Sequence, residues 1–457
     1  MMIRFALLSA AALAIAAFAA AQPALAQSPS GRLALIRDAE IEHTIRAYSA
    51  PIFQAAGMSA AKIQVHLVND NRVNAFVAGG RYIFVNTGLL TRAEHAGQVI
   101  GVIAHETGHI AGGHLVRLQR ELQDAQIKQI IATILAAGAG IATRNAGVAV
   151  AGVGLGARLT EGTFYRFART QEAAADAFGL AMLDRMGISA RGLFEFLQIL
   201  GEQEMLYPQR DPYLRSHPIT RERADDVRQH MARSPHTDKP LPKSFEAMHI
   251  RMRAKLVGFL LPPEQAIGRY RGKEGTLEAR YALAVAYHQN ARLDRALQFI
   301  DGLIKESPND AYFHELRGQI LFESGAAHVR DAIAAYERAV KLAPNEALIR
   351  VGLAQAQLET GDPRLEQAAL ANLKIAMRND DTYPLAWRLL AVAYGKAGDI
   401  GNSALANAEY AYLVQDMQQL RASVAIAERN LKAGTPSWLR LQDIKSQIAQ
   451  IRDERRR

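Results

Sequence analysis

The chain has 457 residues, a formal net charge of +9 and no cysteine. The absence of cysteine excludes disulfide bonds, cysteine nucleophiles and thiolate metal ligands. The length allows two or three domains, each with its own core. The positive charge is spread along the chain apart from one C-terminal cluster of Arg452, Arg455, Arg456 and Arg457. We therefore expect no nucleic acid among the partners.

Residues 1–26 have the pattern of a secretory signal peptide. Arg4 precedes an unbroken run of small apolar residues from Phe5 to Ala21, and small residues at Ala24 and Ala26 mark a cleavage site. The apolar run is short for a membrane span of about 20 residues. We therefore expect an exported chain that is cleaved near Ala26.

A helix and a small sheet are predicted next. Residues 31–56 carry apolar side chains at helical spacing, whereas alternation in residues 63–68, 73–77 and 81–85 predicts three short strands. A peptide could join an exposed edge of this sheet as an added strand, through backbone hydrogen bonds. The simpler alternative is that the sheet only covers the helix that follows.

The stretch from Val99 to Leu115 contains the motif HExxH, formed by His105, Glu106 and His109. Residues four apart leave one face of a helix, so both imidazoles can bind the same metal ion. Glu106 lies beside them, where a carboxylate can take a proton from water. Apolar neighbours predict a buried helix, and buried polar groups are costly unless they are paired or coordinated.

Two apolar segments rich in Gly and Ala follow, at 127–143 and 146–157. Each is shorter than a span of about 20 residues, and the first contains Lys128 and Gln129. We favour a packed helical hairpin or a cover over the active site. Insertion into a membrane and peripheral membrane association are the alternatives.

An acidic pair, Glu172 and Asp176, lies in an Ala-rich helical stretch, and its four-residue spacing places both carboxylates on one face. One carboxylate can complete a zinc site of two histidines and one glutamate that leaves a position for water. The other can accept the N–H of a ligand histidine. Glu172 lies 63 residues beyond His109, and Leu115 stands where the metzincin pattern needs a third histidine, so that arrangement is excluded.

These motifs, in this order, resemble those of the M48 metallopeptidases. The matching segments are Asn74-Ala75-Phe76, Gly79-Gly80, Val85-Asn86-Thr87-Gly88-Leu89-Leu90 and His105-Glu106-Thr107-Gly108-His109. The proline usual between the Phe and the Gly pair is missing, and Val77-Ala78 stands there instead. The resemblance implies a gluzincin-type zinc endopeptidase with one Zn²⁺ per chain. Its ligands would be His105, His109 and Glu172, with Glu106 catalytic and Asp176 supporting the histidines.

A further segment, Ser216-His217-Pro218 followed by Arg223, resembles the HP-x4-R element of the same family. The resemblance implies that His217 is catalytic, either stabilising the developing oxyanion or occupying the open zinc position in a resting form. It also implies that Arg223 anchors the site electrostatically. The alternative is an ordinary helix start before a charged helix.

Residues 234–276 are rich in proline and charge and predict a linker region with one short helix. From residue 277 onward small residues recur at intervals of 34, 36 and 37 positions, at Ala284, Gly318, Ala354 and Ala391. This spacing resembles the tetratricopeptide repeat. Final capping helices are expected over 421–433 and 438–451. Such repeats bind proteins without identifying the partner.

Together the patterns predict a mostly α chain. A signal peptide (1–26) precedes an α+β zincin-like metalloprotease domain with a small sheet (27–233), the linker region (234–276) and a helical repeat solenoid (277–457). The combination resembles the periplasmic members of the M48 family. It implies a protease that degrades or assists misassembled outer-membrane proteins, with the repeats recruiting stalled β-barrel proteins or their assembly machinery. The alternative is a non-proteolytic chaperone or scaffold whose zinc site is structural or plugged.

Overall fold

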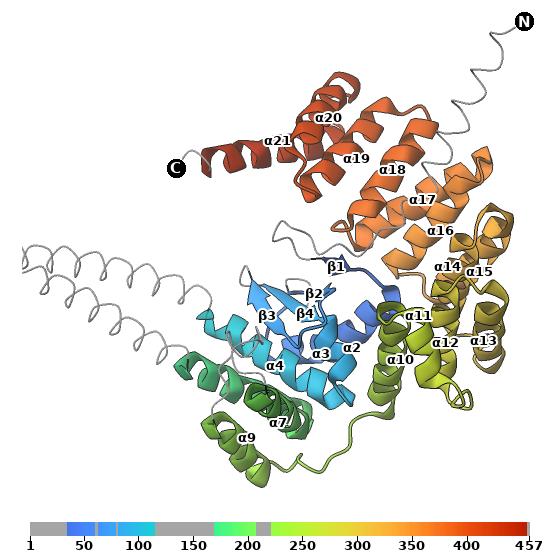
Figure 1. The fold of residues 1–457 in the computed structure, drawn as a ribbon. Coiled ribbons are helices and arrows are strands. Elements are labelled where there is room, and N and C mark those ends of the chain that lie inside the picture. Colours follow the sequence, from blue (N-terminus) through green and yellow to red (C-terminus); the bar gives the residue numbers. More distant parts are fainter. Residues whose placement is uncertain (1–33, 60–62, 79–80, 115–168, 207–220, 455–457) are drawn as a thin grey trace, which may run out of the picture.

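The computed structural model describes residues 34–59, 63–78, 81–114, 169–206 and 221–454 (Figure 1). The predicted signal peptide and the two apolar segments within 127–157 lie outside these residues, so both predictions stay open. No helix in the described part of the chain has the length and apolar character that a bilayer span requires.

A four-stranded mixed sheet forms one side of the N-terminal domain, with the strand order β1-β2-β4-β3. Its strands are β1 (Leu35–Ile36), β2 (Gln64–Val68), β3 (Ala75–Ala78) and β4 (Tyr82–Asn86). β2 runs parallel to β4, and the other two pairs are antiparallel. Alternation places Leu67, Ile83 and Val85 on the buried face. The three predicted strands are confirmed, each to within two residues at either end.

The helices α2 (Ala39–Ala55) and α4 (Ala96–Gly112) pack against this sheet, and the short α3 (Thr87–Arg92) precedes α4. The helix predicted over 31–56 begins only at Ala39 in the described residues, and this part of the prediction is wrong. The Asp38 carboxylate accepts a 2.9 Å hydrogen bond from the Ile41 N–H and caps the helix. The preceding Leu35 and Ile36 form backbone pairs with β2 instead.

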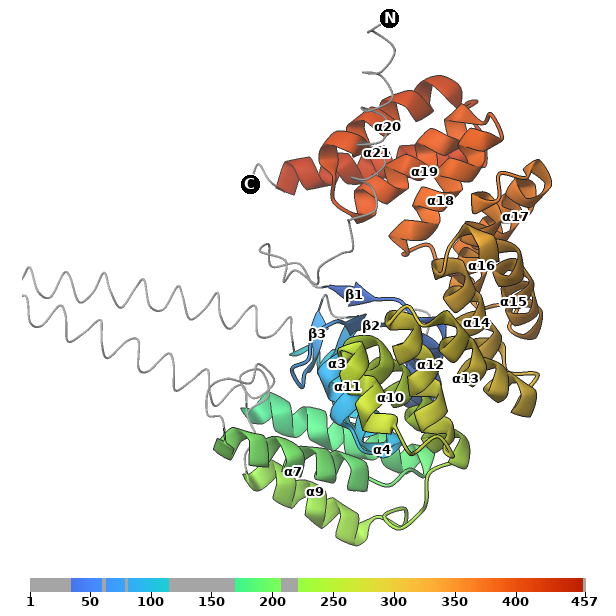
Figure 2. The ribbon, with the colours of Figure 1, turned by 45° about the vertical axis from the view of Figure 1, so that its right-hand side comes forward.

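Three more helices of this domain lie in the described part of the chain. They cover residues 169–186, α7 (Arg191–Leu206) and α9 (Arg221–Arg233). α7 packs along α4, and α9 packs along α7 on the side away from the sheet (Figure 2). The HExxH motif therefore lies on a helix that contacts both α7 and strand β3 of the sheet.

The segment predicted as a linker with one short helix forms two helices, α10 (Lys243–Leu260), which has 18 residues, and α11 (Pro263–Tyr270). The prolines that suggested a linker stand at the helix boundaries, Pro242 before α10 and Pro262 before α11. α10 contributes Met252 to the core of the N-terminal domain and Val257 to the core of the repeats. It therefore joins two cores rather than separating them.

The remaining described chain folds as stacked helix pairs with terminal capping helices, which confirms the repeat architecture. Its α-helices are α12 (Leu277–Gln289), α13 (Leu293–Glu306), α14 (Ala311–Glu323), α15 (Val329–Leu342), α16 (Ala347–Glu359), α17 (Pro363–Asn379), α18 (Pro384–Lys396), α19 (Ile400–Leu413), α20 (Met417–Asn430) and α21 (Pro436–Glu454). The recurring small residues lie buried in the first helix of successive pairs. At Gly318 an added Cβ would lie 2.9 Å from the Tyr336 ring, so this helix crossing needs glycine.

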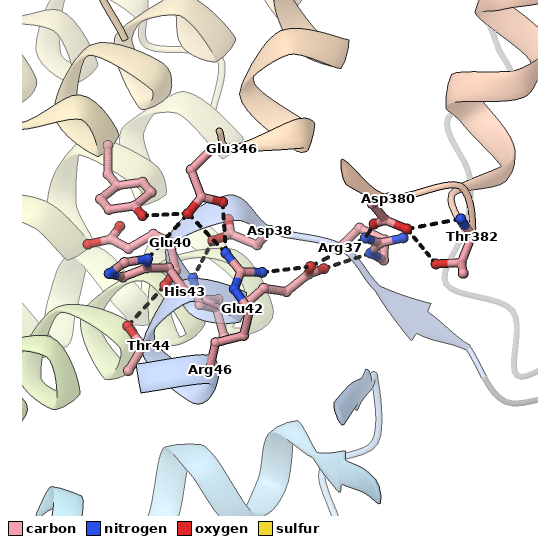
Figure 3. Close-up of polar contacts among 12 residues, drawn as sticks. Arg37, Asp38, Glu40, Glu42, His43, Thr44, Arg46, Glu346, Asp380 and Thr382 are labelled. Atoms are coloured by element: carbon pink, nitrogen blue, oxygen red, sulfur yellow. Dashed lines mark hydrogen bonds and ion pairs between the residues drawn. The ribbon is translucent and has the colours of Figure 1, made fainter. Parts of the chain in front are cut away.

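The start of the N-terminal domain is tied to the repeats by a row of ion pairs (Figure 3). Arg37 pairs with Glu42 at 2.6 Å and with Asp380, which follows α17. Glu346, at the start of α16, accepts a 2.8 Å hydrogen bond from Arg46. Burial alone would raise the pKa of Asp380, but Arg37 and Thr382 outweigh it and hold this pKa below its usual value.

A buried lysine on α10 also connects the same segment to the repeats. The Lys255 ammonium is completely buried and lies 2.8 Å from Asp38 and 3.3 Å from Glu315 of α14. Burial alone would lower the pKa of Lys255, but the surrounding carboxylates raise it well above its usual value. Lys255 therefore stays protonated and neutralises carboxylates from two separate elements.

We predict that Lys255→Met destabilises the chain by about 3–5 kcal/mol, because removing one partner of a buried ion pair leaves the other uncompensated. Urea unfolding of the full chain measures this loss. Adding Glu315→Gln should recover part of it, since one excess carboxylate is then removed. Lys305→Met, at an exposed position on α13, is the matched control. Equal stability of the two methionine variants would contradict the role of Lys255.

Candidate metal site

Three side chains from two distant segments converge on one point. His105, His109 and Glu172 each offer a donor atom, and these atoms lie within 4.8 Å of one another. The two Nε2 atoms are 3.1 Å apart, and the Glu172 oxygens lie 3.2 Å from His109 Nε2 and 3.4 Å from His105 Nε2. Donors at the corners of a tetrahedral zinc site, each about 2.0–2.1 Å from the ion, are about 3.3 Å apart. The donor set and its spacing therefore fit Zn²⁺.

Helix α4 presents the two histidines from its last turns. It begins after His95, whose ring accepts a 3.2 Å hydrogen bond from the Gly97 N–H, and it ends where Gly113 adopts the left-handed conformation (φ 60°). His105 and Glu106 are completely buried, whereas 11% of the His109 side chain is exposed. His109 is thus the more exposed of the two histidines.

Close backbone contact between α4 and the helix over 169–186 brings Glu172 to the histidines. A Cβ added at Gly108 would lie 2.5 Å from the Ala175 carbonyl oxygen, and one added at Gly179 would lie 3.1 Å from the Ala104 carbonyl carbon. Two glycines, one from each helix, therefore let the backbones approach where a larger residue would hold them apart. This close approach places Glu172 of the second helix beside the two histidines.

A carboxylate and a guanidinium support the ligands from behind. Asp176 Oδ1 lies 2.7 Å from His105 Nδ1, the nitrogen that faces away from the ligand cluster. Arg223, on α9, is itself buried, and its guanidinium lies 2.6 Å from Asp176 and 2.8 Å from Glu172. Such outer partners fix the tautomer and orientation of a ligand histidine. Arg223 also balances two buried negative charges.

The electrostatics of these groups favour a bound cation. Burial alone would lower the pKa of His105, but Asp176 and Glu172 outweigh it and raise this pKa to about 10. Burial would raise the pKa of Asp176, yet His105 and Arg223 lower it to about 2. In the metal-free chain the excess negative charge is therefore neutralised by a proton on His105. A divalent cation can replace that proton, because metal binding and proton release are linked.

The structure brings together five of the site residues that the sequence predicts: His105, His109, Glu172, Asp176 and Arg223. Glu106 lies on the same buried helix, and His217 lies outside the described residues. His114, which the sequence analysis did not single out, has its Nδ1 2.9 Å from Nδ1 of His109. Gly112 and Gly113 precede it in the sequence, and the left-handed Gly113 ends α4 and turns the chain so that His114 lies beside His109.

Comparison with known proteins finds two family models that match separate parts of the chain. Residues 36–231 match the model of peptidase family M48, and residues 265–320 match a tetratricopeptide repeat. The chain is 25% identical over 431 residues to the β-barrel assembly-enhancing protease of Escherichia coli K12, covering 93% of this chain and 86% of that protein. The same-named protein of Yersinia pestis is 25% identical, covering 81% of this chain and 75% of that protein. The metalloprotease YcaL of E. coli K12 is 30% identical, covering 37% and 61%.

We predict that Gly108→Ala weakens zinc binding by about 10–100-fold, the range for lost support around a metal ligand. The new methyl group would displace the helix that carries Glu172. Zinc affinity, measured by competition with a chromogenic chelator, tests this. Gly201→Ala on α7 is the matched control, because nothing lies within 4 Å of its added Cβ. An unchanged affinity in Gly108→Ala would show that the close approach does not set the site.

Proposed function

We propose that this chain, which carries an M48 peptidase domain followed by tetratricopeptide repeats, is an exported endopeptidase that depends on one Zn²⁺ ion. The convergence of His105, His109 and Glu172, with spacings that suit a tetrahedral cation, is the main support. The buried Glu106 adds to it, because hydrolysis needs a general base and a structural zinc does not. The names of the relatives support a metalloprotease as well.

The proposed chemistry assigns one task to each residue. His105, His109 and Glu172 hold the zinc ion, which when bound acts as a Lewis acid and lowers the pKa of a bound water to about 7. Glu106 takes a proton from the attacking water and returns it to the leaving amine. Asp176 and Arg223 keep the ligands in position for this reaction.

The clients are proposed from the relatives and from the repeats. Two of the relatives are named as enhancing β-barrel assembly, and repeats of this kind present surfaces for proteins. We propose that the chain works in the periplasm after cleavage near Ala26. There the repeats would recruit unfolded or stalled outer-membrane β-barrel proteins, or the machinery that assembles them. Clients that fail to assemble would then be degraded by the zinc site.

We predict that Glu106→Gln retains zinc but lowers proteolysis at least about 100-fold, since the amide cannot accept the proton. The assay incubates the purified mature protein with an unfolded β-barrel substrate, quantifies fragments, and measures bound zinc separately. Glu94→Gln, at an exposed position before α4, is the matched control.

The same assay separates the protease from a scaffold. A scaffold with a structural or plugged zinc site yields no fragments even from the wild-type chain, with or without a chelator. Chelator-sensitive cleavage that persists at full rate in Glu106→Gln would instead leave the protease in place and remove Glu106 from its proposed role.

His217 remains a prediction from the sequence. We expect His217→Ala to change the turnover number while bound zinc stays at one ion per chain. Zinc content and steady-state rates, measured on the same preparation, test this. Loss of the metal from this variant would show that His217 is an obligatory ligand and not a group that stabilises the oxyanion or reversibly occupies the open position.

A further inference from the structure

The two ligand histidines of the candidate site are supported by different chemical groups. Behind His105 stands the carboxylate of Asp176, at 2.7 Å. Behind His109 stands another imidazole, that of His114, with 2.9 Å between the two Nδ1 atoms. The two rings meet nearly edge to face, at an interplanar angle of 81°. Among the described residues, Asp176 thus lies against the Nδ1 side of His105 and His114 against the Nδ1 side of His109.

The backbone after α4 is shaped to place His114 there. Gly113 adopts the left-handed conformation with φ at 60°, which reverses the chain at the end of the helix. A Cβ added at Gly112 would lie 2.1 Å from His114 Nε2, so the ring packs directly on the helix backbone. His114 is buried, and its carbonyl oxygen lies 3.5 Å from the side-chain amide of Gln171, next to Glu172 in the chain. The residue thus contacts both segments that carry metal ligands.

The chemistry of a bound cation fixes the direction of this hydrogen bond. A neutral imidazole has one N–H and one lone pair. When His109 binds a metal through Nε2, its hydrogen is on Nδ1, so Nδ1 of His114 must accept. His114 then carries its own hydrogen on Nε2. His114 is not placed to be a fourth ligand. The His109 ring points its Nε2 at Glu172, whereas His114 contacts the other ring nitrogen, Nδ1.

We propose that His114 is a positioning residue for the zinc site: it accepts a hydrogen bond from the ligand His109 and fixes the orientation of that ring. This inference rests on the proposed zinc-dependent function. It assigns His109 a neutral partner, whereas His105 has a charged one. His114 thereby orients His109 without adding negative charge to a site that already holds the buried carboxylates of Glu172 and Asp176.

A matched pair of substitutions tests the proposal. In His114→Asn the amide oxygen takes nearly the place of Nδ1 and can still accept the hydrogen bond from His109. The leucine of His114→Leu has almost the same shape as asparagine but no acceptor atom. The zinc dissociation constant of each purified full-length variant, measured by chelator competition, is the main readout. The visible spectrum of the Co²⁺-substituted forms reports the ligand geometry independently. We expect His114→Leu to weaken zinc binding by about 10–100-fold and to alter the Co²⁺ spectrum. His114→Asn should recover most of both.

Gly112→Ala provides a second variant that leaves the imidazole in the chain. Its methyl group would displace the ring, and we expect a loss of zinc affinity similar to that of His114→Leu. Urea unfolding of the metal-free variants identifies any that fail to fold. Equal zinc affinity of His114→Asn and His114→Leu, both folded, would overturn the proposal. Absence of zinc binding by the wild-type chain would instead overturn the proposed function itself, so the two failures are distinguishable.

Discussion

Backbone contact between two helices is the constraint on which the candidate metal site depends. Where α4 crosses the helix over 169–186, Gly108 meets the backbone at Ala175 and Gly179 meets the backbone at Ala104. At these two points no side chain of the glycine separates it from the backbone of the facing helix. Short carboxylate side chains from one helix can then reach imidazoles on the other. Arg223 stabilises the contact further, since it pairs with both Glu172 and Asp176.

Ion pairs also connect the N-terminal domain to the repeats. Lys255, on α10, pairs with Asp38 and Glu315. Arg37, at the start of the N-terminal domain, pairs with Asp380 after α17. A buried ion pair contributes little net stability compared with apolar packing, but a broken one is costly. In the described structure such pairs link the start of the N-terminal domain to the repeats. At the candidate metal site charged groups hold neighbouring side chains together, whereas here they connect two parts of the chain.

The sequence predicted the elements of the site better than their surroundings. His105 and His109 share one helical face by spacing alone, and resemblance to a family supplied Glu172, whose distance in the chain carries no geometric information. The strands were found because alternation is local. Leu35 pairs with Val68 and Ile36 with Leu67, more than 30 positions further along the chain, so the helical pattern around them was misleading. His114 was missed because a left-handed glycine, and not periodicity, turns it back toward His109.

The anchoring of the first strand has a mechanical consequence. β1 pairs with β2 in the sheet, while Arg37, immediately after β1, is bound to Asp380 beyond α17. In the described chain the repeats are therefore connected to the sheet through a paired strand as well as through α10. Under the proposed function, a client held by the repeats would need a connecting segment at least long enough to span this folded connection before its chain could reach the site.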